Sequence, residues 1–213
     1  MKSQQVKVAA ALATGLVAVF LIWRQFANPA ANMRPSSAVG EVLAEEVARV
    51  LGAGGKVALI SRQPLKDGVD ASRDKLAAFE AALKRQTKVK LAPPDWLPRP
   101  PAGTMDLGVV TPEQFAAALE KTPDASAFVI LAGMPQYSKA MVDKLTARSA
   151  KLIAVCGYTA DVKRWLESKV LAVAIVPRAG DLPPGTPKPK SARDWLQQEF
   201  QLLTPETLAD APY

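Results

Sequence analysis

Hydrophobic residues recur along this chain in two patterns, one typical of helices and one typical of buried strands. Between residues 39 and 51 apolar side chains fall three or four positions apart, with Glu41, Glu45 and Arg49 on other faces, which predicts an amphipathic helix. Short continuous apolar runs, as expected of strands buried on both faces of a sheet, then alternate with further helical patterns. The runs that predict strands are 56–61, 88–91, 127–131, 151–155 and 170–176. The helical patterns begin near Ser72, Thr111 and Ser138, surround Trp165, and end with a helix holding Trp195 and Phe200.

This alternation predicts an α/β fold, a three-layer Rossmann-like domain with a mainly parallel sheet of five to six strands. The domain is expected to occupy residues 37–213. Two stretches rich in proline, 92–103 and 177–190, are expected to be exposed loops, because proline cannot continue a helix or a strand ladder.

The chain begins with a segment of a different kind. Residues 8–23 carry no charge, and as a helix they span about 24 Å, somewhat less than the ~30 Å hydrocarbon core of a bilayer. Flanking Lys7 and Arg24 can snorkel to the interface, which makes a short span workable. We predict one transmembrane anchor over residues 1–27, formed by Val8, Leu12, Leu16, Phe20 and Trp23, and a linker over 28–36.

A cleaved signal peptide is the alternative interpretation of this segment, with Lys2 and Lys7 as its basic end. Small residues at the positions that cleavage requires are missing near the end of the apolar run, so an uncleaved anchor is favoured. The basic start favours a bacterial-type inner-membrane location, with a single pass and the soluble domain in the periplasm.

The charge pattern and the residue types present in the chain exclude several classes of function. The net charge is +7, but basic and acidic residues alternate, as in Arg73-Asp74-Lys75, rather than gathering with aromatic residues as nucleic-acid modules require. The chain has no histidine and one cysteine, Cys156, so it lacks a base for a cysteine nucleophile and the usual ligands of a zinc site. We therefore expect no nucleic-acid partner, no metal, no cofactor and no enzymatic activity.

The glycine-rich stretch 52–56 (GAGGK) superficially resembles a phosphate-binding loop. Such loops follow a strand and open a helix, whereas this one closes a helix and precedes a strand. Residues 52–56 are therefore interpreted as a turn.

Candidate ligand-binding residues follow the predicted strands, because ligands of open parallel sheets bind beyond the carboxyl ends of the strands. Polar groups and stacking surfaces at these positions are offered by Arg62, Asp95, Trp96, Gln136, Tyr158 and Arg178. The alternative is that they are solvated loop residues without a special role.

The order of elements, together with several local phrases, resembles one lobe of the type 1 periplasmic solute-binding fold. The phrases include 54–60 (GGKVALI), 123–130 (PDASAFVI), 152–157 (LIAVCG) and 166–177 (LESKVLAVAIVP), with 200–206 (FQLLTPE) similar to that family's last strand and turn. The resemblance covers most of residues 37–206. It implies solute binding between two lobes, yet this chain has room for only one.

Two functions follow as expectations. The first is a non-catalytic, membrane-anchored interaction or scaffolding domain, an accessory subunit of a larger membrane assembly with other protein subunits as partners. The alternative is a module that binds or senses a small polar solute through the loops at the strand carboxyl ends, across a dimer if a second copy supplies the missing lobe.

Overall fold

The computed structural model describes residues 34–52, 54–63, 71–85, 88–98, 110–157, 159–180, 182 and 185–210. The predicted anchor, with Val8, Leu12, Leu16, Phe20 and Trp23, lies outside these residues and stays a prediction. Within the part of the chain that the structure describes, no helix combines the length and the apolar character needed to cross a membrane.

Helices and strands alternate as the hydrophobic pattern predicts. The helices are α2 (Pro35–Leu51), α3 (Ala71–Arg85), α4 (Pro112–Lys121), α5 (Lys139–Ala147), α6 (Ala160–Glu167), α7 (Ala192–Glu199) and the 3₁₀ turn η2 (Leu208–Asp210). The strands are β1 (Gly55–Arg62), β2 (Val89–Leu91), β3 (Asp95–Leu97), β4 (Ala127–Ile130), β5 (Lys151–Val155), β6 (Leu171–Pro177) and β7 (Phe200–Leu203).

Seven strands form one sheet in the order β2-β1-β4-β5-β6-β7, and β3 also pairs with β1. All pairs are parallel except β6 with β7. The α/β, Rossmann-like architecture with a mainly parallel sheet is thus confirmed. The sheet is larger than the predicted five to six strands, because the apolar pattern does not indicate β3 and only the family resemblance of residues 200–206 indicates β7.

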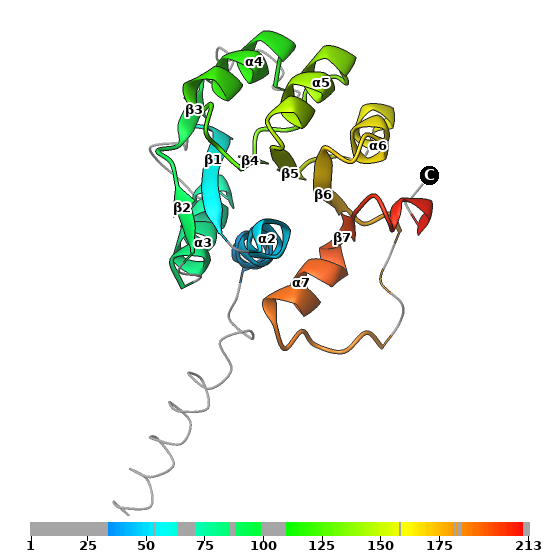
Figure 1. Ribbon diagram of the computed structural model, residues 1–213. Coiled ribbons are helices and arrows are strands. Elements are labelled where there is room, and N and C mark those ends of the chain that lie inside the picture. Colours follow the sequence, from blue (N-terminus) through cyan, green and yellow to red (C-terminus); the bar gives the residue numbers. More distant parts are fainter. Residues whose placement is uncertain are drawn as a thin grey trace, which may run out of the picture.

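The sheet is covered on both faces, which gives three layers (Figure 1). Helices α4, α5 and α6 pack on one face, and α2, α3 and α7 on the other. The alternation along β1 shows why both faces are apolar, since Ala58 and Ile60 enter the first core while Val57 and Leu59 enter the second. Trp165 of α6 is fully buried in the first core.

The edge strand beside β1 is interrupted by prolines. β2 pairs with the first half of β1 and β3 with its second half, and Pro93-Pro94 lie between them. Proline has no backbone N–H for the ladder, so the chain leaves the sheet and pairs again at Asp95. The prediction that 92–103 is entirely loop is therefore wrong for residues 95–97.

The last helix ends one residue earlier than predicted. Phe200, assigned to that helix from its apolar spacing, is the first residue of β7 and pairs with Pro177 of β6. The antiparallel β7 closes this edge of the sheet, so the end of α7 lies beside the carboxyl end of β6.

Helix α2 is fixed to both of its neighbours on the second face. Gly40 lies against α3 so closely that an added Cβ would be 2.2 Å from the Lys75 carbonyl oxygen. Toward α7, the buried Glu46 accepts hydrogen bonds from Arg193 Nη2 at 2.9 Å and from Arg49 Nε at 2.7 Å. These contacts position α7, which forms one wall of the pocket described below.

Candidate ligand-binding site

The strand order reverses between β1 and β4, which makes this point of the carboxyl edge the first place to look for a ligand. β1 continues toward Arg62, and β4 toward the loop 131–138. The two strands are in register there, since the Leu131 amide donates to the Ile60 carbonyl at 2.9 Å. The structure thus brings the ends of these two strands together.

At the switch point Arg62 is held by the neighbouring strand. Its Nη1 donates to the Pro98 carbonyl oxygen at 3.0 Å, directly after β3. The guanidinium therefore fixes the chain at the end of β3, which is a structural use of the residue.

Asp95 and Trp96 lie in β3 and not in a loop, so they point to opposite faces of the sheet. Asp95 is on the α4 face with Leu97, and its Oδ1 accepts a hydrogen bond from Lys121 Nζ of α4. Its buried Oδ2 has no hydrogen-bond partner among the described residues. Trp96 leaves 40% of its surface exposed on the other side. The two side chains therefore cannot enclose one ligand together.

Gln136 is exposed on the loop after β4, and this loop is firmly held. Trp165 Nε1 donates to the Pro135 carbonyl oxygen at 3.1 Å, and the Tyr137 ring meets the Trp165 ring edge-on with centroids 5.4 Å apart. Tyr158, the predicted stacking residue after β5, lies outside the described residues.

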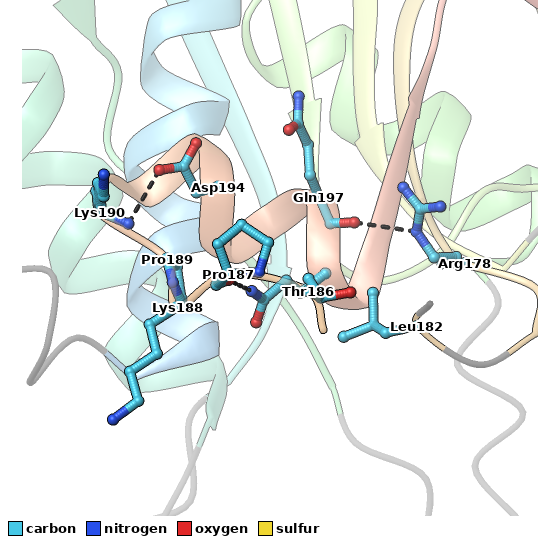
Figure 2. Close-up of a pocket in the computed structure, with 10 residues that line it drawn as sticks. Arg178, Leu182, Thr186, Pro187, Lys188, Pro189, Lys190, Asp194 and Gln197 are labelled. Carbon is cyan, nitrogen blue, oxygen red and sulfur yellow. Dashed lines mark hydrogen bonds between the residues drawn. The ribbon is translucent and has the colours of Figure 1, made fainter. Parts of the chain in front are cut away.

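Arg178, which follows β6, does line a cavity. The cavity has a volume of about 450 Å³ and lies between the loop after β6 and helix α7 (Figure 2). Besides Arg178, its lining residues are Leu182, Thr186, Pro187, Lys188, Pro189, Lys190, Asp194, Gln197 and Gln198. We call this cavity the α7 pocket; its size falls in the range of about 300–1,000 Å³ typical of small-molecule sites.

The loop that walls the α7 pocket is tied to α7 at its start. The Arg178 amide donates to the Glu199 carbonyl oxygen at 2.9 Å, and Arg178 Nε donates to the Gln197 carbonyl oxygen at 3.0 Å. Carbonyls in the last turn of a helix lack partners within the helix, and a cation beside them is favourable. Arg178 therefore caps the carboxyl end of α7.

Two further bonds tie the middle and the end of the loop (Figure 2). Gln198 Nε2 donates to the Pro187 carbonyl oxygen at 3.0 Å, and the Lys190 amide donates to Asp194 Oδ2 at 2.9 Å. Ser191 caps α7 by accepting from the Asp194 amide at 3.1 Å. Because the prolines also restrict the backbone, the wall is built by the chain itself and needs no ligand to form.

The lining of the α7 pocket is cationic. Arg178, Lys188 and Lys190 stand against one acid, Asp194, which leaves a net charge of +2. The Asp194 pKa is lowered, first by the Lys190 backbone N–H and then by the Ser191 side chain, so this carboxylate is ionised at neutral pH and already engaged by the loop.

Sequence reasoning selected Arg178 but missed the rest of the α7 pocket, because 177–190 was interpreted only as a loop. A signal was present in Ser191-x-x-Asp194, the spacing of a helix cap whose acid reaches back to the preceding chain. The side chains of Arg178 and Gln198 donate to backbone carbonyl oxygens. Bonds of this kind cannot be recognised from the residue pattern, because every residue has a carbonyl.

Cys156, at the carboxyl end of β5, is suited to packing and not to chemistry. Burial raises the pKa of its thiol to about 12, so the thiol is protonated at neutral pH. Among the described residues, no group of three or more aspartate, glutamate or cysteine side chains is placed to hold a metal ion.

Comparison with known proteins finds similarity in structure and none in sequence. No protein-family pattern matches the chain, and no curated protein matches it. Among solved structures, an arabinose-binding protein from Geobacillus stearothermophilus superposes with a TM-score of 0.56 at 13% identity, covering 84% of this chain and 63% of that one. The chain has the fold of a type 1 periplasmic solute-binding protein.

Two other solute-binding proteins of ABC transporters give the same result. One, from Burkholderia graminis in complex with D-arabinose, has a TM-score of 0.54 at 15% identity and 84% coverage of this chain. The other, from Agrobacterium vitis with bound α-D-tagatopyranose, has a TM-score of 0.53 at 15% identity and 82% coverage. This chain spans 62% of the length of the first protein and 58% of the second, so it matches more than half of each but not the whole.

These neighbours are named as solute-binding or sugar-binding proteins. At these identities the comparison establishes the fold alone, so the ligand has to be argued from the α7 pocket itself.

Proposed function

We propose that this domain is a non-catalytic module that binds a small polar solute in the α7 pocket. The observation that carries the proposal is a cavity of about 450 Å³ at the carboxyl end of β6, with polar and charged walls that the loop and helix hold in place. A preformed wall favours binding, because the ordering cost is met during folding and not on association. The fold of solute-binding lobes supports the same proposal.

We further propose that residues 1–27 anchor the domain to the membrane, that 28–36 link the two, and that the domain works outside the cytoplasm. The first described helix supports a boundary in this region, since α2 begins at Pro35 with proline in its favoured first-turn position.

The test is a ligand-dependent rise in melting temperature of the full-length chain in nonionic detergent, measured with neutral sugars and small organic acids. A ligand at one hundred times its Kd stabilises the folded state by about 2.7 kcal/mol. A shift of several degrees is therefore expected for a true ligand. A flat response across the panel would contradict the proposal.

A pair of variants locates the site. Thr186→Trp places a large side chain in the α7 pocket and should abolish the ligand-dependent shift. Lys84→Gln, on the exposed side of α3, removes a charge elsewhere and should leave the shift unchanged. Equal shifts in both variants would show that the ligand binds at another site.

A further inference from the structure

The α7 pocket joins an apolar surface to a cationic rim, and this combination points to a class of ligand. Leu182 is one of two large hydrophobic side chains that are exposed among the described residues, with 39% of its surface accessible. It lines the pocket together with Pro187 and Pro189. An exposed leucine beside two prolines offers an apolar contact surface to the body of a small molecule.

The positive charges of the rim are only partly offset by described acids, since the charge of Lys190 is one of the causes that lower the Asp194 pKa. Among the residues that the structure describes, neither Arg178, Lys188 nor Lys190 takes part in an ion pair. The acid of the lining, Asp194, is engaged by the Lys190 backbone N–H, and it sits at the start of α7. The loop also carries Asp181, which lies outside the described residues.

A neutral sugar fits this lining less well than an anion does. No tryptophan, tyrosine or phenylalanine is among the residues that line the α7 pocket, so the flat stacking surface that favours a sugar ring is missing from it. The net charge of +2 instead attracts a carboxylate, with which lysine and arginine form charge-assisted hydrogen bonds.

We infer that the α7 pocket binds a small organic carboxylate with an apolar body, the carboxylate toward the cationic rim and the body against Leu182, Pro187 and Pro189. This inference rests on the proposed solute-binding function and specifies its ligand class. In Figure 2 Arg178 and Leu182 lie together at one end of the pocket, whereas the side chain of Lys188 extends from the other end. Arg178 and Leu182 therefore place a charge beside apolar surface at one end, whereas the Lys188 side chain points away from the other lining residues (Figure 2).

The experiment uses the isotope-labelled full-length chain in nonionic detergent and compares benzoate with benzamide by amide NMR. The two probes have the same ring and nearly the same shape, but only benzoate is charged. Benzoate should shift the amides of Thr186, Lys188 and Lys190 and of residues 194–198 with saturation, and benzamide should bind at least roughly fivefold more weakly. Added salt should weaken benzoate binding and leave benzamide unchanged, as expected of a partly exposed charge interaction.

Charge variants test the rim. The double variant Lys188→Gln/Lys190→Gln should weaken benzoate binding by roughly three- to tenfold, since each partly exposed charge contributes a modest amount. It should leave benzamide unaffected. Lys84→Gln is the matched control and should change neither.

The outcomes separate this inference from the proposed function. If benzamide or D-arabinose shifts the amides of the α7 pocket as strongly as benzoate, the carboxylate inference is wrong, whereas solute binding in the pocket stands. If benzoate shifts amides elsewhere only, the assignment of the carboxylate to this pocket is wrong. If no solute shifts the amides of the pocket, both the inference and the proposed function fall.

Discussion

The buried carboxylate of Glu46 joins α2 to α7, and its replacement offers a quantitative test of how the wall of the α7 pocket is held. Glu46 is 3% exposed, and it accepts from Arg193 Nη2 at 2.9 Å and from Arg49 Nε at 2.7 Å. The pKa of Arg193 is raised, and its hydrogen bond to Glu46 is the largest cause. Glu46→Gln keeps the volume and removes the charge.

The loss of stability expected for Glu46→Gln depends on how exposed Arg193 and Arg49 are. Breaking a buried ion pair costs about 3–5 kcal/mol when the remaining charge stays buried. Here Arg193 is 45% exposed and Arg49 57%, so water can solvate them after the change. We therefore expect Glu46→Gln to lower the free energy of unfolding by about 1–2 kcal/mol. This is the range for a charge-assisted hydrogen bond that a neutral hydrogen bond and water partly replace. This corresponds to a fall of roughly 2–8 °C in melting temperature for a domain of this size.

Glu45 provides the matched control. It contacts the same Arg193 nitrogen at 2.9 Å, but it is 47% exposed, and exposed ion pairs contribute about 0–1 kcal/mol. Urea unfolding of the full-length chain, followed by circular dichroism, should give Glu45→Gln a cost below about 0.5 kcal/mol. Equal and small losses for both variants would refute the argument that burial makes the Glu46 bridge the stronger one.

Two further predictions concern α2 and Asp194. Gly40→Ala should destabilise the domain by about 1–3 kcal/mol in urea unfolding, because its Cβ would clash with the backbone of α3, although alanine is the better helix former. Gly157→Ala, with open space around the added Cβ, should change stability by less than about 0.5 kcal/mol, and a similar loss at both sites would contradict the reasoning. Because the Asp194 pKa is lowered in the folded state, its stabilising contribution is present above the unfolded pKa near 4 and is lost as pH falls through the lower folded value. Asp194→Asn should therefore reduce the acid-induced loss of stability, and an unchanged pH profile of unfolding would show that this carboxylate does not contribute.

The hydrophobic pattern predicts the parts of the fold in which burial alone decides the structure. The run 127–131 contains β4, in which every side chain of Ala127–Ile130 is buried, as expected of a short continuous apolar run in the middle of a parallel sheet. Thr111 opens α4 as predicted, and its side chain and that of Gln114 each bond the other's backbone N–H, which is a local contact that the sequence displays directly. Local and periodic signals are therefore sufficient for these elements.

The features that were predicted wrongly from the sequence are determined by contacts between distant parts of the chain. Asp95–Leu97 becomes a strand because β2 pairs only with the first residues of β1 and leaves that edge of its second half open, which no window of sequence around residue 95 reveals. Phe200 leaves the last helix because it pairs with Pro177 across the chain. In the same way, Arg62 and Arg178 are both arginines at the carboxyl ends of strands, yet one bonds the Pro98 carbonyl and the other lines a cavity. Their neighbours, and not their position along the chain, decide which of them can meet a ligand.

The α7 pocket differs from a site that lies between two lobes, which needs a surface from each of them. The α7 pocket has both walls in one chain, the loop from Arg178 to Lys190 and the helix that follows it, joined by bonds at their start, middle and end. Because no closure of lobes is needed, affinity is set by the preformed lining and its charge. Binding by an isolated monomer is therefore the expected behaviour, and a strict requirement for dimerisation would point back to the open switch point between β1 and β4.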